Sequence, residues 1–315
     1  MSNSYFGPVF PVLPSYDESG ALDCFAIQKY VSYLERHGAE TVMTTAGTCQ
    51  FNLLTTGEIL MLNKCVAESF AGRVILGTPT LAEIHLAEFM NEVARVTVRP
   101  RLLLCFPERY YDSDDVASFF GRMSKLTNED AELYVHGLPI RDARKGTQDY
   151  DSALVAAIRS SGKKVVGMKE ESSTYEAGFS LCSSTLDKDD FEFIVAGGSM
   201  RRFILLATAG AQSFFSGVGS LYPEIEISFF DHYTEGRLKE AQTIVRECET
   251  PVFQTFMEIG WHRSLRHAAK RLGLIRGEER LPMTGATAQQ MDRIDLALKS
   301  LEGRLSLLKR KGVVR

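Results

Sequence analysis

Eight short apolar segments, each followed by a longer amphipathic one, constrain the fold of this 315-residue chain more than any other feature. The pairs repeat every 25 to 35 residues or so, roughly the length of one strand and one helix. The short segments are apolar on both faces, which is typical of parallel strands covered by helices. We expect strands at 6–13, 41–45, 73–77, 102–105, 132–136, 164–168, 191–196 and 212–216.

The number and order of these strand-helix pairs predict a closed (β/α)8 TIM barrel, an α/β fold that reaches this chain length as a single domain. The competing architecture is an open doubly wound sheet, which often begins with a glycine-rich turn. The first turn here, Pro14-Ser-Tyr-Asp-Glu18, contains no glycine. The barrel is therefore the preferred fold class.

The pattern becomes purely helical toward the C-terminus. We expect residues 1–235 to form the barrel and 236–315 to form a C-terminal helical extension packed on it, as one structural unit. Two apolar stripes support the extension: Leu265, Ala268, Ala269 and Leu272 in one, and Ile294, Leu296, Leu298, Leu301, Leu305 and Leu308 in the other.

Composition disfavours several classes of protein. A net charge of −4 provides no basic surface for nucleic acid. No apolar run approaches the roughly 18 residues that cross a membrane. The six cysteines form no CxxC pair, and no leader pattern precedes residue 20, so reduced thiols and a cytoplasmic location are expected. His262 and His267 are five residues apart rather than four, and neither a metal site nor a cofactor is expected.

Chemistry in a barrel lies at the carboxyl ends of the strands, and one lysine occupies such a position. Lys169 follows Val165-Val-Gly-Met168, where the apolar barrel wall meets the mouth. A desolvated lysine has a lowered pKa, which makes its amine a nucleophile. The alternative is a lysine that extends toward solvent and pairs with Glu170 or Glu171.

Other strand ends carry weaker candidates. Tyr134 and His136 are two residues apart on one strand and share a face. Either can relay protons beside an imine, or both can be structural. The turn Gly47-Thr48-Cys49 offers amides and a hydroxyl to a carboxylate, or is a plain turn.

Two further candidates concern anions. The glycines of Gly197-Gly198-Ser199 precede an expected helix and are a weak indication of phosphate binding. Arg141 is either an anion clamp or a partner in a salt bridge at the rim.

Taken together, these segments resemble the dihydrodipicolinate synthase and N-acetylneuraminate lyase family of class I aldolases over nearly the whole chain. The most specific match is the lysine in Val166-Gly-Met-Lys169-Glu170. The other matching segments are Gly7-Pro-Val-Phe-Pro-Val-Leu-Pro14, Asp17 with Gly20-Ala-Leu-Asp23, Gly47-Thr48 with Leu54-Thr55 and Glu58, Pro139-Ile-Arg141, Ala196-Gly-Gly198 and Ser213-Phe-Phe215.

The resemblance implies a role for each matching position. Lys169 would form the Schiff base with pyruvate or another 2-keto acid. Thr48 and the amides of Thr48 and Cys49, after Gly47, would hold the keto-acid carboxylate. The main-chain carbonyl near Phe214 would face the keto acid. Gly198, in the matching segment Ala196-Gly-Gly198, is a further candidate for substrate binding.

The resemblance also concerns partners. Arg141 would clamp the carboxylate of a second substrate. The family is usually a homotetramer built as a dimer of dimers, so a homo-oligomer (dimer or tetramer) is expected.

The chain departs from the family pattern at several positions. Cys49-Gln50-Phe51 stands where the family has a second hydroxyl residue, a glycine and an acid. Counting back from Pro139, His136 stands at the family's catalytic tyrosine, and a two-residue shift would let Tyr134 serve instead. Tyr110 and Tyr111 lie near the place of the tyrosine that the synthases insert from a neighbouring subunit.

Three functions follow as hypotheses. The first is a lyase or aldolase that forms a Schiff base and makes or breaks a C–C bond. The second is a barrel without catalysis that binds a keto acid as a sensor or scaffold. The third is a phosphate-sugar isomerase or aldolase that uses Gly197 and Gly198.

Overall fold

Within the described part of the chain, eight of the strands form one sheet, the sheet of the predicted (β/α)8 barrel. A computed structural model describes residues 5–107, 112–142, 146–184 and 191–315, with the side chains of 140–142 and 147 outside the description. The strands follow the order β1-β2-β3-β4-β5-β8-β9-β10. A parallel bridge between Val9 and Phe215 joins the first strand to the residue after the last.

All eight strands overlap the predicted segments, although several are shorter. β8 instead extends past its predicted end and includes Lys169 and Glu170, because Lys169 pairs in register with His136 on one side and Ile194 on the other. The strands are β1 (Val9–Pro11), β2 (Thr41–Met43), β3 (Arg73–Gly77), β4 (Arg101–Leu104), β5 (Glu132–Gly137), β8 (Val165–Glu170), β9 (Glu192–Val195) and β10 (Ser213–Phe214).

A small hairpin after β5 was not predicted. β6 (Ile140–Asp142) and β7 (Gly146–Gln148) pair antiparallel, with Arg141 opposite Thr147. Each strand has three residues, and together they lack the run of β-branched and aromatic residues by which strands are recognised. The backbone of Arg141 is therefore part of a strand.

Helices follow the strands, and several begin at a polar residue that caps the exposed amides of the first turn. The Asp23 side chain accepts from the Ala26 amide, and Asp151 accepts from the Leu154 amide. Within the described ranges, no helix combines the length and apolar character needed to cross a membrane. The helices are α1 (Cys24–Arg36), α2 (Thr56–Ser69), α3 (Glu83–Val93), α4 (Ser113–Leu126), α5 (Ser152–Ser161), α6 (Tyr175–Ser183), α7 (Ser199–Leu206), α8 (Pro223–Thr234), α9 (Leu238–Ile244), α10 (Thr250–Ile259), α11 (Trp261–Arg271) and α12 (Ala288–Arg310).

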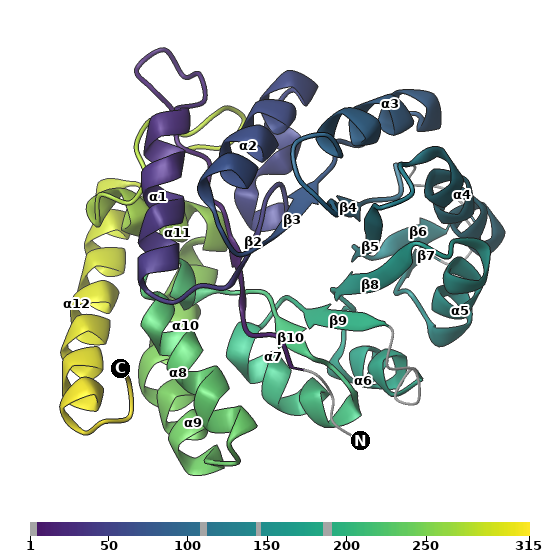
Figure 1. Ribbon diagram of the computed structural model, residues 1–315. Helices are drawn as coiled ribbons and strands as arrows, with labels where there is room; N and C mark the ends of the chain where they lie inside the picture. The colour runs from purple at the N-terminus through teal and green to yellow at the C-terminus, as the bar shows by residue number, and fades with distance from the viewer. Residues whose placement is uncertain (1–4, 108–111, 143–145, 185–190) are drawn as a thin grey trace. The chain divides into compact units, whose positions relative to one another are not determined.

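Two compact units divide the chain. Unit 1 comprises residues 1–9 and 74–215, and unit 2 comprises 10–73 and 216–315. In unit 1, α4 and α5 lie side by side (Figure 1), and Gly121 allows their close approach, because a Cβ there would lie 2.9 Å from Ser161 Cβ.

Unit 2 contains the helices of the predicted extension. α10 packs against α12, and α12 buries Ile294, Leu298, Leu301, Leu305 and Leu308. Leu296 was predicted in the same stripe, but its side chain is 70% exposed. Residues two apart on a helix do not share a face, so Leu296 points away from the buried side.

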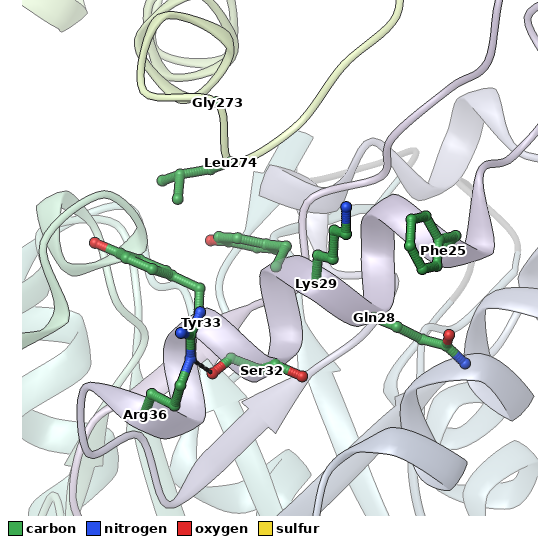
Figure 2. A pocket seen from close by; sticks show the side chains of 9 residues that line it. Phe25, Gln28, Lys29, Ser32, Tyr33, Arg36, Gly273 and Leu274 are labelled. Carbon is green, nitrogen blue, oxygen red and sulfur yellow. Dashed lines mark hydrogen bonds between the residues drawn. The ribbon is translucent and has the colours of Figure 1, made fainter.

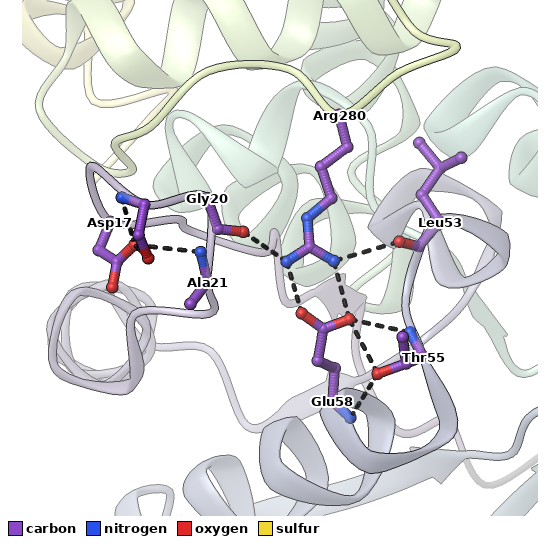
Figure 3. A network of polar contacts seen from close by, with 8 residues as sticks. Asp17, Gly20, Ala21, Leu53, Thr55, Glu58 and Arg280 are labelled. Atoms are coloured by element: carbon purple, nitrogen blue, oxygen red, sulfur yellow. Dashed lines mark hydrogen bonds and ion pairs between the residues drawn. The ribbon is translucent and has the colours of Figure 1, made fainter.

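Arg280 links two loops and a helix within unit 2 (Figure 3). Its guanidinium donates to the carbonyl oxygens of Gly20 and Leu53, at 2.6 Å and 3.2 Å. It also donates to both carboxylate oxygens of Glu58, which caps the start of α2 together with Thr55. The hydrogen bonds from Arg280 lower the pKa of Glu58 to about 2.

Replacing Glu58 by Gln is expected to reduce stability in a way that depends on pH. The folded-state pKa lies below the ordinary value of 4.5, so the ion pair stabilises the fold above pH 4.5. This contribution is lost as the pH falls from 4.5 toward 2. Urea unfolding of Glu58→Gln should therefore show a lower midpoint than wild type near neutral pH, and the difference should shrink in acid.

Glu68→Gln is the matched control, since Glu68 is an exposed carboxyl on the same helix. Its unfolding midpoint should follow that of wild type at each pH. A difference between wild type and Glu58→Gln that does not change with pH would contradict the role given to the ion pair.

Candidate active site

Lys169 lies inside unit 1 near the carboxyl end of β8, where register places it directly between His136 of β5 and Ile194 of β9. Its side chain is 1% exposed. Burying an ammonium group is costly unless an opposite charge and hydrogen bonds compensate. The surroundings of Lys169 must therefore supply that compensation.

Among the described residues, the side chains of Glu171, His136 and Phe215 lie against the amine. Glu171 Oε1 forms an ion pair with Lys169 Nζ, and His136 Nε2 lies 3.4 Å from the same nitrogen. Glu171 Oε2 lies 3.7 Å from His136 Nε2, so the carboxylate bridges the two nitrogens. The Phe215 ring covers the amine, with its centroid 4.7 Å from Nζ. We call Lys169, His136 and Glu171 the lysine cluster.

Burial determines the charge of His136. Loss of solvent, and then the nearby charge of Lys169, hold the pKa of His136 well below its ordinary 6.5. The imidazole is therefore neutral near pH 7, and one of its nitrogens can accept a proton. Burial also raises the pKa of the Cys105 thiol to about 11, against the opposing effect of Lys169, so this thiol stays protonated.

Tyr134 occupies the layer below the lysine cluster. Its register partner is Gly167, which is in turn opposite Glu192. The phenol donates a hydrogen bond of 2.5 Å to Glu192 Oε2. A Cβ at Gly167 would lie 2.5 Å from the Tyr134 ring, so the glycine makes room for it. The structure thus brings His136 to Lys169 and directs the Tyr134 hydroxyl to Glu192.

Glu170 points away from the lysine cluster. It is fully buried and accepts from Arg202 Nε at 3.1 Å and Nη2 at 2.8 Å. Arg202 also donates to the Ser172 carbonyl oxygen at 2.9 Å. Of the two carboxylates predicted as partners of Lys169, the structure gives Glu171 that place and gives Glu170 to Arg202. The buried amine does not extend to solvent.

Gly198 packs against Arg202. A Cβ at Gly198 would lie 2.9 Å from Arg202 Cβ, and Gly197 has a φ of 73°, which favours glycine. Gly198 directly precedes α7, the helix that carries Arg202. Close packing against Arg202 thus explains Gly198, and backbone conformation explains Gly197.

The turn after β2 lies in unit 2. Residues Gly47–Cys49 form one short 3-10 turn, in which the Cys49 amide donates to the Ala46 carbonyl oxygen at 2.9 Å. The Cys49 thiol is fully buried and donates to the Met43 carbonyl oxygen. Thr48 is partly exposed in the middle of this turn. The Cys49 amide, predicted to hold a carboxylate, is used inside the turn in this structure.

Comparison with known proteins shows similarity to one family. The model of the dihydrodipicolinate synthetase family matches residues 146–301. A 4-hydroxy-tetrahydrodipicolinate synthase of Moorella thermoacetica is 23% identical over 90% of this chain and 94% of its own length. The corresponding protein of Archaeoglobus fulgidus is 20% identical over 94% and 99%. Over these lengths the chain is similar to proteins of the dihydrodipicolinate synthetase family.

Solved structures of the family share the fold. The 4-hydroxy-tetrahydrodipicolinate synthase of Methylacidiphilum fumariolicum SolV matches with a TM-score of 0.85 at 16% identity, covering 98% of this chain and all of the other. A prophage protein of the family from E. coli K12, solved in complex with pyruvate, has a TM-score of 0.82 at 13% identity, covering 94% and 99%. At these identities the likeness establishes the (β/α)8 fold.

Gln50 keeps a glycine-like backbone where the family pattern has glycine. Its φ of 54° and ψ of 38° are left-handed, and Thr45, near the start of the same segment, also has a positive φ of 46°. The Gln50 side chain is 3% exposed, and within the described part of the chain its amide nitrogen and oxygen have no hydrogen-bond partner. Backbone strain and an unsatisfied amide are both costly, and both occur in functional segments.

The remaining predicted residues are distributed as follows. The Phe214 ring is fully buried against Phe203, at 5.2 Å between centroids, while the next residue, Phe215, faces Lys169. The side chain of Arg141 lies outside the described residues, as do Tyr110 and Tyr111.

Glu171 is the site residue that sequence reasoning underestimated, because it was considered only as a partner of an extended lysine. The period of a strand could have identified it. Residues two apart along a strand direction share a face, so Glu171 is directed to the same side as Lys169.

A surface pocket of unit 2 has different chemistry (Figure 2). It measures about 500 Å³ and lies between α1 and the segment Gly273-Leu274. Lys29 Nζ lies 4.3 Å from the ring centroid of Phe25, which is 62% exposed. The nine lining residues include no carboxylate and no cysteine, so the pocket offers no acid-base pair comparable to the lysine cluster.

Replacing Gln50 by Gly should preserve stability better than replacing it by Ala. Both changes remove the unsatisfied amide, but only glycine adopts a positive φ without steric cost. We expect Gln50→Gly to be more stable than Gln50→Ala by about 1 kcal/mol in urea unfolding. Equal stability of the two variants would show that the left-handed backbone carries no cost.

Replacing Glu170 by Gln should destabilise unit 1 strongly, because Arg202 would remain buried without its counter-charge. Breaking a buried pair in this way costs about 3–5 kcal/mol. Glu176→Gln, at an exposed position on α6, should change stability by less than about 0.5 kcal/mol. Chemical unfolding of the two variants measures both, and similar stabilities would refute the structural role of Glu170.

Proposed function

We propose that this chain is a Schiff-base-forming lyase of the class I aldolase type, which makes or breaks a C–C bond of pyruvate or another 2-keto acid. The observation that carries the proposal is the buried amine of Lys169, held by Glu171 and within 3.4 Å of His136 Nε2. Imine formation needs a nucleophilic amine and nearby groups that accept and return its protons. The lysine cluster contains both.

The comparisons support the same chemistry. The relatives of this chain from Moorella thermoacetica and Archaeoglobus fulgidus are named 4-hydroxy-tetrahydrodipicolinate synthases. The E. coli K12 family protein was solved in complex with pyruvate. By extension, pyruvate or a related keto acid is the proposed substrate here.

The proposed reaction begins at Lys169 Nζ, which attacks the keto carbon. A proton of the Lys169 amine passes to a neighbour in the lysine cluster. The hydroxyl of the resulting carbinolamine then leaves as water. The Phe215 ring excludes solvent from one side of the amine. Thr48 with the amides around Gly47 and Cys49 is proposed to bind the carboxylate, and Arg141 to recognise the second substrate.

A barrel that only binds a keto acid is the less favoured function. Binding a carboxylate does not need a buried ammonium, whose desolvation reduces stability. A lysine held at 1% exposure against a neutral histidine and a carboxylate is better explained by covalent chemistry.

We also propose that the chain forms a homo-oligomer, a dimer or a tetramer, as the family resemblance implies. Light scattering of the purified protein measures its mass in solution. A mass of one chain, 35.1 kDa, at all concentrations would refute the proposal.

Borohydride reduction in the presence of pyruvate should attach the keto acid to Lys169. Mass spectrometry of the peptide that contains Lys169 measures the adduct. Lys169→Arg keeps a cation beside Glu171 but lacks a nucleophilic amine, so no adduct and no turnover are expected. Lys163→Arg, at an exposed position before the same strand, should react as wild type does.

Two results would oppose the proposal. Normal turnover by Lys169→Arg would exclude Lys169 as the nucleophile. A wild-type protein that forms no adduct with pyruvate, or with a panel of other 2-keto acids, would favour the binding function.

A further inference from the structure

We propose that Glu171 carries protons between the Lys169 amine and the substrate oxygen during imine formation, an inference that rests on the proposed lyase function. In this arrangement His136 positions the carboxylate and the amine and does not store the proton. The family resemblance assigned proton transfer to a residue on β5, at His136 or Tyr134. The geometry points instead to the carboxylate two residues after the lysine.

The first argument is the geometry of the carboxylate. Glu171 Oε1 contacts Lys169 Nζ, and Oε2 lies 3.7 Å from His136 Nε2. The side chain is 20% exposed, whereas Lys169 and His136 are 1% and 2% exposed. The carboxylate thus reaches from the buried amine toward the side open to solvent, from which a substrate arrives.

The second argument compares Glu171 with the other carboxylates nearby. Glu170 is committed to Arg202 and to the Ser172 amide, which donates at 2.6 Å. Glu192 accepts from Tyr134 in the layer below. Each of these carboxylates is held by a partner away from the amine, while Glu171 is in direct contact with it.

The third argument concerns where a proton can be held. If the lysine proton moved to His136 instead, it would create an imidazolium on a side chain that is 2% exposed, and burial holds the pKa of His136 well below its ordinary 6.5. A protonated Glu171 is neutral, so its formation removes an ion pair without creating new charge. The carboxylate is therefore the better acceptor of the lysine proton.

The proton balance of imine formation is consistent with Glu171 as a carrier that returns to its carboxylate form. A ketone and an ammonium group yield an iminium ion and water, so two of the three protons on Nζ leave with the ketone oxygen. Glu171 takes the first proton, Nζ attacks the keto carbon, and the carboxylic acid protonates the alkoxide. It then takes a second proton from the nitrogen and gives it to the departing hydroxyl. Glu171 ends as a carboxylate beside the iminium cation.

The test measures the rate of imine formation with pyruvate, by borohydride quenching of the full-length protein at successive times and mass spectrometry. Glu171→Gln should slow adduct formation by about 10²- to 10⁴-fold, the usual contribution of general acid-base catalysis. Glu171→Asp keeps a carboxylate and should recover part of the rate. Glu176→Gln, an exposed change on α6, should react at the wild-type rate.

A second measurement separates proton transfer from a purely structural counter-charge. Formate and acetate, two small carboxylates of equal charge and different pKa, can each enter the space vacated in Glu171→Ala. Each should accelerate adduct formation in proportion to its concentration, and by an amount that depends on the pKa of the acid if it transfers protons, whereas a counter-charge alone would be restored equally by both. Neither should accelerate wild type. Thermal unfolding of each variant identifies those that fold, and Glu171→Ala with formate and acetate decides the question if Glu171→Gln does not fold.

The outcomes distinguish this inference from the proposed function. If wild type forms the adduct and Glu171→Gln forms it at the same rate, the proton-carrier role is overturned while the lyase function stands. The role is also overturned if an added carboxylate does not accelerate Glu171→Ala and Glu171→Asp is as slow as Glu171→Gln. If wild type forms no adduct with any keto acid, the proposed function itself fails.

Discussion

The burial of one ammonium group is the constraint on which the site depends. Lys169 is almost completely removed from water, and the Glu171 carboxylate offsets the cost of that burial. The same burial keeps His136 neutral. Three ordinary side chains thereby acquire properties suited to proton transfer around an amine. A surface lysine with the same neighbours would remain a hydrated cation.

Successive side chains of β8 point to opposite faces of the sheet, and this alternation makes the arrangement possible. β8 directs Lys169 toward His136 of β5, and the next residue, Glu170, is directed toward Arg202 of α7. Glu171 then returns to the side of the lysine. Two consecutive carboxylates thus have different tasks, one inside the lysine cluster and one anchoring a helix to the strand. Register positions Lys169 and His136, and Glu171 follows directly after the end of β8.

The structure gives physical reasons for two departures from the family pattern, at His136 and at Gln50. Tyr134 could not simply replace His136, because a shift of two residues moves a side chain into the next layer, where Glu192 accepts from the phenol. At the turn after β2, Gln50 retains the left-handed backbone expected of glycine and leaves its amide without a partner in the described chain. Both positions are among those at which this chain departs from the family pattern that it resembles.

The sequence by itself determined the eight-unit barrel and the place of Lys169, because periodic apolar patterns report which faces are buried. It also identified Tyr134 and His136 as sharing a face, but not which of them reaches the amine. Only the tertiary structure decided that, through the register of β5 against β8. It likewise separated Glu170 from Glu171, and it revealed the β6–β7 hairpin, whose short polar strands have no distinctive pattern. Contacts between strands depend on pairing across the sheet, and a one-dimensional pattern does not contain that information.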